Sequence, residues 1–540
     1  MKSLLKLISV TVLFAVAGLP LRLAAEAGEE KLHYKLITLG KAGTLGGSVA
    51  NPYGGINNRS WLTGDSSLPA DPTVLRDHPD VIEHGFLWRD GAMIDLGTLG
   101  GQNSSVGNTT TNVIGLIVGN AQTGDADPTG DCISTGECWG SGFSCPAAIP
   151  CQGYQNLVRG FVWKDGAMRA LPTLGGNNSA AYGANNLGQI VGLSETNTSD
   201  TSCVGPQQLG QQFDVEAVVW GPKPGEIRVL PPLPGDVLAG ALAINDRGQV
   251  VGGSGPKCNL PSPINIAHAV LWQDGKPIDL GNFGGVQNNL ASAINNRGQV
   301  VGASDLPGDA TGHAFLWQHG VMTDLTPLDF FSAAGNINES GQVVGTSCDA
   351  NFNCHGFLWE NGVLTDLNAL LPAGTALQVI AGGGINDLGE IAVQIFDPAT
   401  GSMGPTPLAL MIPDPDADAA QLGFNAVSTD GLPDQVRTVL QQRMKLGPFG
   451  RAPAAIPAHS TRHTADAIVS ALAGAKPSTS NAAPQSCGVL GALCGLGHRC
   501  CAGELCGPHR TCCDKPLHGM ACNSSVECCQ GLCINHECTG

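Results

Sequence analysis

Histidines recur at one position of a repeated segment, where they could bind a metal ion. They stand at His84, His268, His313 and His355. Imidazole nitrogen is a common ligand of zinc and other transition metals. A residue that returns once per repeat, however, usually meets a packing or hydrogen-bonding need that returns with the repeat. We therefore predict a structural role for these histidines, and no metal site.

Two short acidic segments could hold calcium through carboxylate oxygens. They contain Asp125, Asp127 and Asp131, and Asp414, Asp416 and Asp418. Neither has the glycine and terminal glutamate spacing of an EF-hand loop, which favours solvated acidic turns. Calcium is the one cofactor left open, and no other is predicted.

Motifs of catalysis are absent from the sequence, which has no G-x-S-x-G, no H-E-x-x-H and no P-loop. The balance of 27 basic and 45 acidic residues gives a formal net charge of -18. Such a chain repels a phosphate backbone, so nucleic acid is excluded as a partner. Activity itself is not excluded, because catalytic sites can also be assembled from separated loops.

The first 27 residues predict a secretory signal peptide. Lys2 and Lys6 precede an apolar run, and small residues follow at Ala24, Ala25 and Ala27. No later stretch of about 20 apolar residues predicts a transmembrane segment. We therefore expect a secreted, extracellular protein.

The 20 cysteines fit an oxidising compartment and are expected to form disulfides. Eight precede residue 400: Cys132, Cys138, Cys145, Cys151, Cys203, Cys258, Cys348 and Cys354. The first four lack the close pairs of zinc sites. Cys203 and Cys258 follow equivalent strands of adjacent repeats and are candidates for a bridge between repeats. Cys348 and Cys354 are candidates for closing a small loop.

A repeat accounts for most of the chain. It reads HGFLWRDGAMIDLGTLGG from His84, and further copies begin at Arg159, Glu216, His268, His313 and His355. Each is followed by a second signature such as AINDRGQVVG from Ala243; Asn57, Asn112 and either Asn185 or Asn186 hold the equivalent place elsewhere. The shortest interval between repeated tryptophans, from Trp317 to Trp359, is the length of a four-stranded propeller blade.

Turn chemistry supports four short strands in each unit. D-G or N-G pairs such as Asp90-Gly91 separate the FLW strand from the MIDLG strand, and N-x-x-G separates the AIN strand from the QVVG strand. Valine, leucine, alanine and glycine occupy both faces of the expected strands, as in sheets that pack face to face. The sequence predicts an all-β, seven-bladed β-propeller over residues 33–413. PLALMIP from Pro407 and KLITLG from Lys35 should pair to close the ring, which removes free edges and favours a monomer.

The repeat resembles the HAF-repeat family of extracellular proteins, whose His-Ala-Phe tripeptide stands here at His313, Ala314 and Phe315. The resemblance covers about residues 33–413. It weakens at the Glu216 copy, which lacks the histidine and the D-G turn, and at the last copy, which loses GQVVG. The resemblance implies export and repetition, and it carries no established activity.

Beyond the propeller we expect a linker rich in Ala, Pro and Ser over 414–486, with a short helix around Asp434–Lys445. A small disulfide-rich module follows over 487–540. Its cysteines are Cys487, Cys494, Cys500, Cys501, Cys506, Cys512, Cys513, Cys522, Cys528, Cys529, Cys533 and Cys538. Two six-cysteine blocks with a central CC pair are similar to tandem knottins; six cysteines permit 15 pairings. The resemblance implies Cys487–Cys501, Cys494–Cys506 and Cys500–Cys512 in the first block.

Function is expected on the propeller rim that carries the long connections, because variable loops there stand on a rigid scaffold. The insertion from Asn120 to Asn156, with Trp139 and Phe143, is the leading candidate contact surface. We predict a non-enzymatic extracellular protein that binds a glycan or another protein. The alternative is a secreted polysaccharide hydrolase or lyase that uses acidic residues of that rim. A third possibility is an inhibitor or toxin-like tail displayed by the propeller.

Overall fold

The computed structural model describes most of the predicted propeller and four short strands of the tail. The described residues are 33–39, 55–68, 82–107, 112–128, 132–133, 137–138, 156–199, 213–256, 266–326, 329–399, 408–414, 437, 505–506, 512–513, 532–534 and 537–539. The chain forms two compact units, Met1–His459 and Ser460–Gly540.

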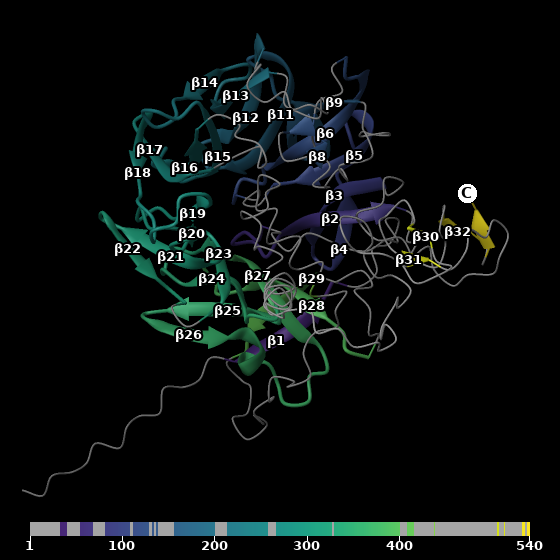
Figure 1. Cartoon of the computed structure of the whole chain (residues 1–540), viewed down its shortest axis with the longest axis vertical. Helices are drawn as coiled ribbons and strands as arrows, with labels where there is room; N and C mark the ends of the chain where they lie inside the picture. The colour runs from purple at the N-terminus through teal and green to yellow at the C-terminus, as the bar shows by residue number, and fades with distance from the viewer. Residues whose placement is uncertain are drawn as a thin grey trace, which may run out of the picture. The chain divides into compact units, whose positions relative to one another are not determined.

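The first unit is a seven-bladed β-propeller, as predicted, whose blades follow one another in chain order around the ring (Figure 1). In chain order, blade 1 is β2 (Leu62–Leu68), β3 (Ile82–Arg89) and β4 (Ala92–Asp95); blade 2 is β5 (Gly100–Val106), β6 (Ile117–Ala126), β9 (Asn156–Lys164) and β10 (Ala167–Ala170); blade 3 is β11 (Gly175–Ala184), β12 (Ile190–Ser199), β13 (Phe213–Trp220) and β14 (Ile227–Leu230); blade 4 is β15 (Leu238–Ile244), β16 (Val250–Gly255), β17 (His268–Gln273) and β18 (Lys276–Asp279). Blade 5 is β19 (Asn289–Ile294), β20 (Val300–Asp305), β21 (Gly312–Gln318) and β22 (Val321–Asp324); blade 6 is β23 (Phe331–Ile337), β24 (Val343–Cys348), β25 (Cys354–Glu360) and β26 (Val363–Asp366); blade 7 is β27 (Gln378–Ile385), β28 (Ile391–Phe396), β29 (Leu408–Pro413) and β1 (Tyr34–Thr38).

The AIN strand is the innermost strand of each blade. The strands β11, β15, β19, β23 and β27 contact one another in that order around the ring. The sequence repeat therefore straddles two blades: FLW and MIDLG are the outer strands of one blade, and AIN and QVVG are the inner strands of the next. In blade 1 the described part of the inner segment is Gly55–Asn57, where Ile56 bridges to Leu62.

The two ends of the propeller sequence share blade 7, as predicted. Strand β1 pairs antiparallel with β29, with Tyr34 opposite Pro413 and Thr38 opposite Ala409. In Figure 1 the purple β1 lies beside the green β29. This pairing supplies the fourth strand of the last blade and removes an open edge.

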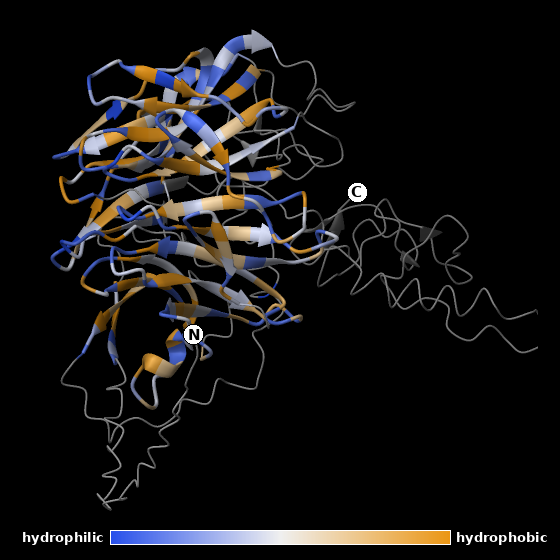
Figure 2. Cartoon of the chain, turned by 90° about the vertical axis from the view of Figure 1, so that its left-hand side faces the viewer, coloured by the Kyte–Doolittle hydropathy of each residue, from blue (hydrophilic) through white to orange (hydrophobic). Residues whose placement is uncertain are grey.

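The blades pack face to face, which explains why both alternations of the strands are apolar. Every residue of β16 and of β28 is buried. Figure 2 shows hydrophobic segments along the strands, with hydrophilic residues at many of the turns that join them. The core is thus divided into clusters between neighbouring blades; one of them joins Ala243 and Val251 of blade 4 to Ala291 and Phe315 of blade 5.

The glycine of the QVVG signature is required because the backbone of the neighbouring strand approaches it closely. A bulge in the inner strands of blades 3 to 7 shifts the register, for example between Ala291 and Ala293. A Cβ atom on Gly302 would lie 1.9 Å from the carbonyl oxygen of Leu290 and 2.9 Å from the ring of Phe315. Phe315 belongs to the HAF tripeptide and stands opposite Gly302 in the ladder. The two signatures therefore pack against each other.

The second unit contains two short antiparallel ladders, β30 (Leu505–Cys506) with β31 (Cys512–Cys513) and β32 (Leu532–Ile534) with β33 (Glu537–Thr539). The expected knottin pairings depend on cysteines outside the described residues. The expected helix around 434–445 also lies outside them, except for Arg437, which is helical.

Candidate functional site

The propeller has two different rims. The N-x-x-G turn joins the first and second strands of a blade, and the D-G turn joins the third and fourth. Because the strands are antiparallel, both turns lie on one side of the propeller, which we call the short-turn rim. The connections from second to third strands and the LGG loops between blades form the opposite, long-loop rim. The connection from β6 to β9 spans residues 127–155, whereas the one from β20 to β21 spans only 306–311. This arrangement is the one expected from the sequence.

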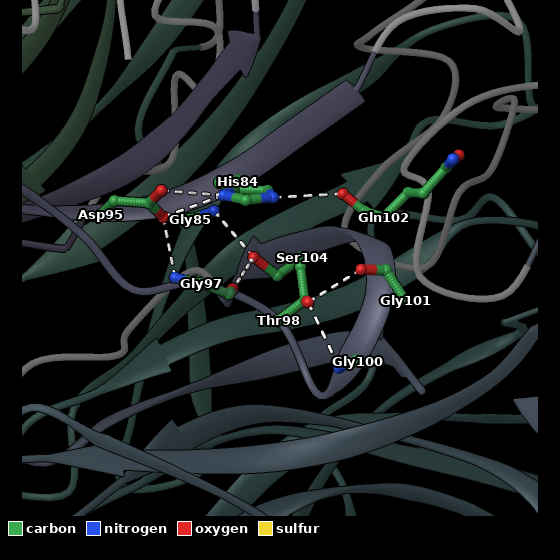
Figure 3. A network of polar contacts seen from close by, with 9 residues as sticks. All are labelled: His84, Gly85, Asp95, Gly97, Thr98, Gly100, Gly101, Gln102 and Ser104. Carbon is green, nitrogen blue, oxygen red and sulfur yellow. Dashed lines mark hydrogen bonds and ion pairs between the residues drawn. The ribbon is translucent and has the colours of Figure 1, made fainter. Parts of the chain in front are cut away.

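A repeated histidine network joins blades at the long-loop rim (Figure 3). Nδ1 of His84 lies 2.9 Å from Oδ1 of Asp95 on the outer strand, and Nε2 lies 3.2 Å from the carbonyl oxygen of Gln102 in blade 2. The backbone N–H of Gly85 donates to Oγ of Ser104, which in turn donates to the carbonyl of Gly97. The histidine therefore ties the outer strand of one blade to the inner strand of the next.

The same arrangement returns between blades 5 and 6. Nδ1 of His313 lies 2.8 Å from Oδ2 of Asp324, and its Nε2 lies 3.1 Å from the carbonyl oxygen of Asp329. Oδ1 of each partner aspartate accepts a backbone N–H two residues later, from Gly97 or Thr326. The aspartate thus orients the histidine and caps the turn after the outer strand. Burial raises the pKa of Asp95, but the His84 hydrogen bond, the Gly97 N–H and the His84 charge outweigh it and lower that pKa.

A serine, an aspartate and a histidine also meet in blade 4, but they are not arranged for nucleophilic catalysis. Ser254 Oγ donates to Oδ2 of Asp236, and Nδ1 of His268 lies 2.9 Å from the same oxygen. Ser254 is fully buried and bonds the carboxylate rather than the imidazole. A nucleophile activated by histidine requires a hydrogen bond between the hydroxyl and the imidazole. The hydrogen bonds of these residues instead fix the start of β15, the inner strand of blade 4.

Two consecutive copies depart from the histidine–aspartate pair. In blade 2, Arg159 and Ala170 replace the pair, and in blade 3, Glu216 and Val229 replace it. Both departures lie on the long-loop rim. They adjoin the connections over 127–155 and 200–212.

A charged cluster replaces the histidine network between blades 2 and 3. We name it the junction cluster; its members are Asp127, Arg159, Asn177, Asn178 and Glu195. Oε2 of Glu195 accepts the backbone N–H groups of Asn177 and Asn178 at 3.1 and 2.8 Å. The side-chain amides of Asn177 and Asn178 donate to the two carboxylate oxygens of Asp127, at 3.3 and 3.0 Å. The cluster thus connects a strand of each blade to the base of the long connection.

Arg159 is the one cation of the junction cluster. Burial lowers the pKa of its guanidinium, while the charges of Glu195, Asp127 and Asp125 act in the opposite direction. Its Nη1 atom is buried and has no hydrogen-bond partner among the described residues. A buried donor without a partner is costly unless another group satisfies it. Arg159 is therefore a candidate for contact with a ligand.

Glu216 occupies the corresponding position between blades 3 and 4. Its Oε2 atom is buried without a hydrogen-bond partner among the described residues. Burial, and then the charge of Asp214, raise the pKa of the Glu216 carboxyl. A half-buried carboxyl group with a raised pKa is able to act as a general acid.

A ring of asparagines encircles the axis at the short-turn rim. In each of these turns the asparagine Oδ1 accepts N–H groups of the same turn, and in all but the Asn112 turn the asparagine Nδ2 donates to the carbonyl of the next asparagine around the ring. The links run from Asn185 to Asn245, Asn295, Asn338, Asn386, Asn57 and Asn112, at 2.9 to 3.0 Å. The structure therefore selects Asn185, and not Asn186, as the member from blade 3.

A second ring lies one residue further along each turn. The backbone N–H of Asn186 donates to Asp246, that of Asp246 to Asn296, and that of Asn296 to Glu339. The series continues to Asp387 and Asn58 across the closure of the propeller. Polar side chains that the sequence presents as surface turns are thus used to hold the blades together.

The structure describes only some of the residues singled out from the sequence. Asp127 lies in the junction cluster, and Asp125 acts on Arg159 through its charge. Trp139, Phe143, Asp131, Asp416 and Asp418 lie outside the described residues, as do Cys145, Cys151, Cys203 and Cys258. Cys132 and Cys138 stand opposite each other on the short strands β7 (Cys132–Ile133) and β8 (Glu137–Cys138). Cys348 and Cys354 are joined by a disulfide that closes the loop from β24 to β25.

Within the described part of the chain, no group of three His, Cys, Asp or Glu side chains has the geometry of a metal site. The same residues include no helix long and apolar enough to cross a membrane.

Comparison with known proteins identifies similar folds only. No family model and no curated protein matches the chain. Among solved structures, the acylaminoacyl peptidase of Pyrococcus horikoshii is 9% identical over 66% of this chain and 50% of its own, with a TM-score of 0.37. The β-propeller domain of the Trilobed protease from Pyrococcus furiosus is 9% identical over 71% of this chain and 98% of its own, with a TM-score of 0.39. A gluconolactonase from Xanthomonas campestris has 11% identity, 71% and 90% coverage, and a TM-score of 0.32.

This chain spans half the length of the first of these structures. At such low identities and TM-scores the similarities carry no argument about activity or ligand.

Proposed function

We propose that the chain is an exported protein whose propeller binds an extracellular glycan or protein at the long-loop rim. The predicted signal peptide and the resemblance to HAF repeats support export. The single observation that carries the binding proposal is the junction cluster, which replaces a structural histidine–aspartate pair at the base of the connection over residues 127–155. The knottin-like tail is proposed as a second recognition or anchoring module.

The chemistry of the junction cluster favours a ligand rich in hydroxyl or amide groups. Carboxylate, amide and guanidinium groups lie together there, and planar polar groups of this kind form paired hydrogen bonds. Asp127 and Glu195 flank the single cation Arg159, so the cluster repels anions. A neutral glycan or a peptide backbone therefore fits better than a phosphate or sulfate group.

The test uses the full secreted chain and measures its thermal midpoint with neutral and acidic polysaccharides, cell-wall fragments, peptides and divalent metals. A ligand that binds only the folded state stabilises it by about 2.7 kcal/mol at a hundred times its Kd. The variant R159H/A170D restores the histidine–aspartate pair of the other blades. We expect it to fold and to lose the shift, whereas R297Q, on the opposite rim, should keep it.

A panel that shifts nothing, with a cooperative transition intact, contradicts the binding proposal. A shift that survives in R159H/A170D contradicts the placement at the junction cluster.

Glu216 favours a second candidate, a polysaccharide hydrolase or lyase acting at the same rim. Its raised pKa means that ionisation opposes folding, so stability is full below the unfolded pKa and falls as pH rises through the folded pKa. E216Q should therefore stabilise the chain at neutral pH, by at most about 1 kcal/mol after solvent screening, and change nothing near pH 4. Urea unfolding at both pH values measures this.

The same variant tests catalysis. If the chain cleaves a polysaccharide of the panel with Glu216 as general acid, E216Q should lower the rate at least about 100-fold. Equal rates would remove Glu216 from the chemistry. A stability difference that is larger at low pH would contradict the raised pKa.

A further inference from the structure

The N-x-x-G turn of blade 1 departs from all other copies at two positions. Its sequence is Asn57-Asn58-Arg59-Ser60-Trp61, with serine in place of glycine and tryptophan in place of the residue that is glutamine in four blades. Ser60 has a φ of 58°, in the left-handed region that glycine occupies in the other turns. Its hydroxyl donates to Glu390 of blade 7, at 2.9 and 2.7 Å from the two carboxylate oxygens. The conformation is thus fixed across the closure of the ring.

Trp61 belongs to a cross-strand pair that is polar in blades 4, 5 and 6. The equivalent glutamines donate from Nε2 to the opposite side chain: Gln249 to Gln273 at 3.2 Å, Gln299 to Gln318 at 3.3 Å, and Gln342 to Glu360 at 3.2 Å. In blade 1, Leu62 stands opposite Trp88, which puts Trp61 and Arg89 in this position. A tryptophan–arginine pair has therefore replaced a hydrogen-bonded amide pair.

Two guanidinium groups lie against the Trp61 ring. The Cζ atom of Arg59 is 5.4 Å from the ring centroid, and that of Arg89 is 5.1 Å from it. The ring itself rests on the turn of blade 2, where a Cβ atom on Gly115 would lie 3.1 Å from it. Stacking on an indole holds a guanidinium in place while its N–H groups stay available. The aromatic ring thus orders two cations at one spot.

Neither arginine forms an ion pair with a residue that the structure describes, although the chain carries a net charge of -18. Two guanidinium groups that lie about 5 Å from one indole ring carry like charges that repel each other. An anion bound by both groups reduces that repulsion and accepts charge-assisted hydrogen bonds.

We propose that Arg59, Trp61 and Arg89 form a binding site for the oxyanion groups of an acidic extracellular polymer. The site is on the short-turn rim and is independent of the junction cluster, which repels anions. Carboxylate, sulfate and phosphate groups share the geometry that a guanidinium recognises with paired hydrogen bonds.

The experiment measures retardation of the full secreted chain in native gels containing polygalacturonate, dextran sulfate or neutral dextran, at low ionic strength. The test variant W61Q/R89Q recreates the amide pair of blades 4 and 5, so it should fold. The matched control R297Q removes an arginine at the position of Arg59 in the turn of blade 5. We expect retardation by an acidic polymer, weakened about tenfold or more in W61Q/R89Q and less than about twofold in R297Q.

Each result bears on the proposal. The polymer that retards the chain identifies the oxyanion, and competition by inorganic phosphate shows that a free oxyanion binds as well. Equal weakening in R297Q shows unspecific attraction and overturns the site, as does the absence of retardation by both acidic polymers. Should W61Q/R89Q fail to show a cooperative thermal transition, R59Q, which changes one exposed turn residue, replaces it with the same expectation.

Discussion

Replacing Asn295 with alanine is expected to lower the free energy of unfolding by about 3 kcal/mol. Its Nδ2 donates to the carbonyl of Asn338 at 3.0 Å and to Oε1 of Gln299 at 2.8 Å. Its Oδ1 accepts the backbone N–H groups of Arg297 and Gln299. The residue is buried, so alanine leaves several polar groups without a partner in the core of the short-turn rim.

Urea unfolding of the full chain measures this loss, and two variants serve as controls. R297A changes an exposed residue of the same turn and should stay within about 0.5 kcal/mol of the unmodified chain. Asn112 belongs to the same ring, but its Nδ2 has no partner among the described residues. Leu116 stands where Gln299 stands in blade 5, so N112A should cost clearly less than N295A. Equal losses in N295A and N112A would contradict the importance of the ring contacts.

Replacing Tyr34 with alanine is expected to cost about 3 to 5 kcal/mol, as for other large buried aromatic side chains. Tyr34 is only 1% exposed although it belongs to the outermost strand β1. It packs in a cluster with Ile391, Met411 and Val344, and so joins blade 7 to blade 6. Losing it should free the strand that closes the ring. Urea unfolding measures the loss, and faster proteolysis within β1 provides a second measurement.

Tyr34→Phe separates packing from the hydroxyl group. The hydroxyl oxygen is buried without a hydrogen-bond partner among the described residues, so phenylalanine should be neutral or slightly stabilising. Burial, followed by the charge of Glu360, raises the pKa of Tyr34. Stability from this group is therefore complete below the unfolded pKa of about 10 and is lost as pH rises further. Y34F should remove that alkaline loss; a loss of several kcal/mol at neutral pH in Y34F would contradict the packing argument.

The two rims of the propeller use their polar side chains differently. On the short-turn rim, asparagines, aspartates and backbone amides are occupied in two rings that hold the blades in place. The exception is blade 1, where Trp61, Arg59 and Arg89 leave the pattern. On the long-loop rim, histidine–aspartate pairs join blade 1 to blade 2 and blade 5 to blade 6, whereas Arg159 and Glu216 replace the histidine in blades 2 and 3. The departures from the internal repeat are therefore the positions at which we propose that side chains contact ligands.

The sequence by itself determined the type of fold, the number of blades and the closure of the ring. These follow from local chemistry: D-G and N-x-x-G pairs specify tight turns, and apolar residues on both alternations specify sheets buried on both faces. The repeat shows which strand is missing from the last blade. The sequence therefore allowed Tyr34–Thr38 to be matched to that strand. The departures at Arg159, Glu216 and Trp61 were also visible in the sequence, but the sequence did not show what these side chains contact.

Only the tertiary structure decided which strand faces the axis and what the recurring polar residues contact. The histidine of each network bonds an aspartate eleven residues later and a carbonyl of the following blade. The junction cluster collects positions 127, 159, 177 and 195 from two blades. Such contacts join neighbouring blades of the ring, and insertions of different lengths separate the contacting residues in the sequence. Apart from the eleven residues between histidine and aspartate, no fixed spacing in the sequence indicates these contacts, because packing between blades, and not the local backbone, brings the side chains together.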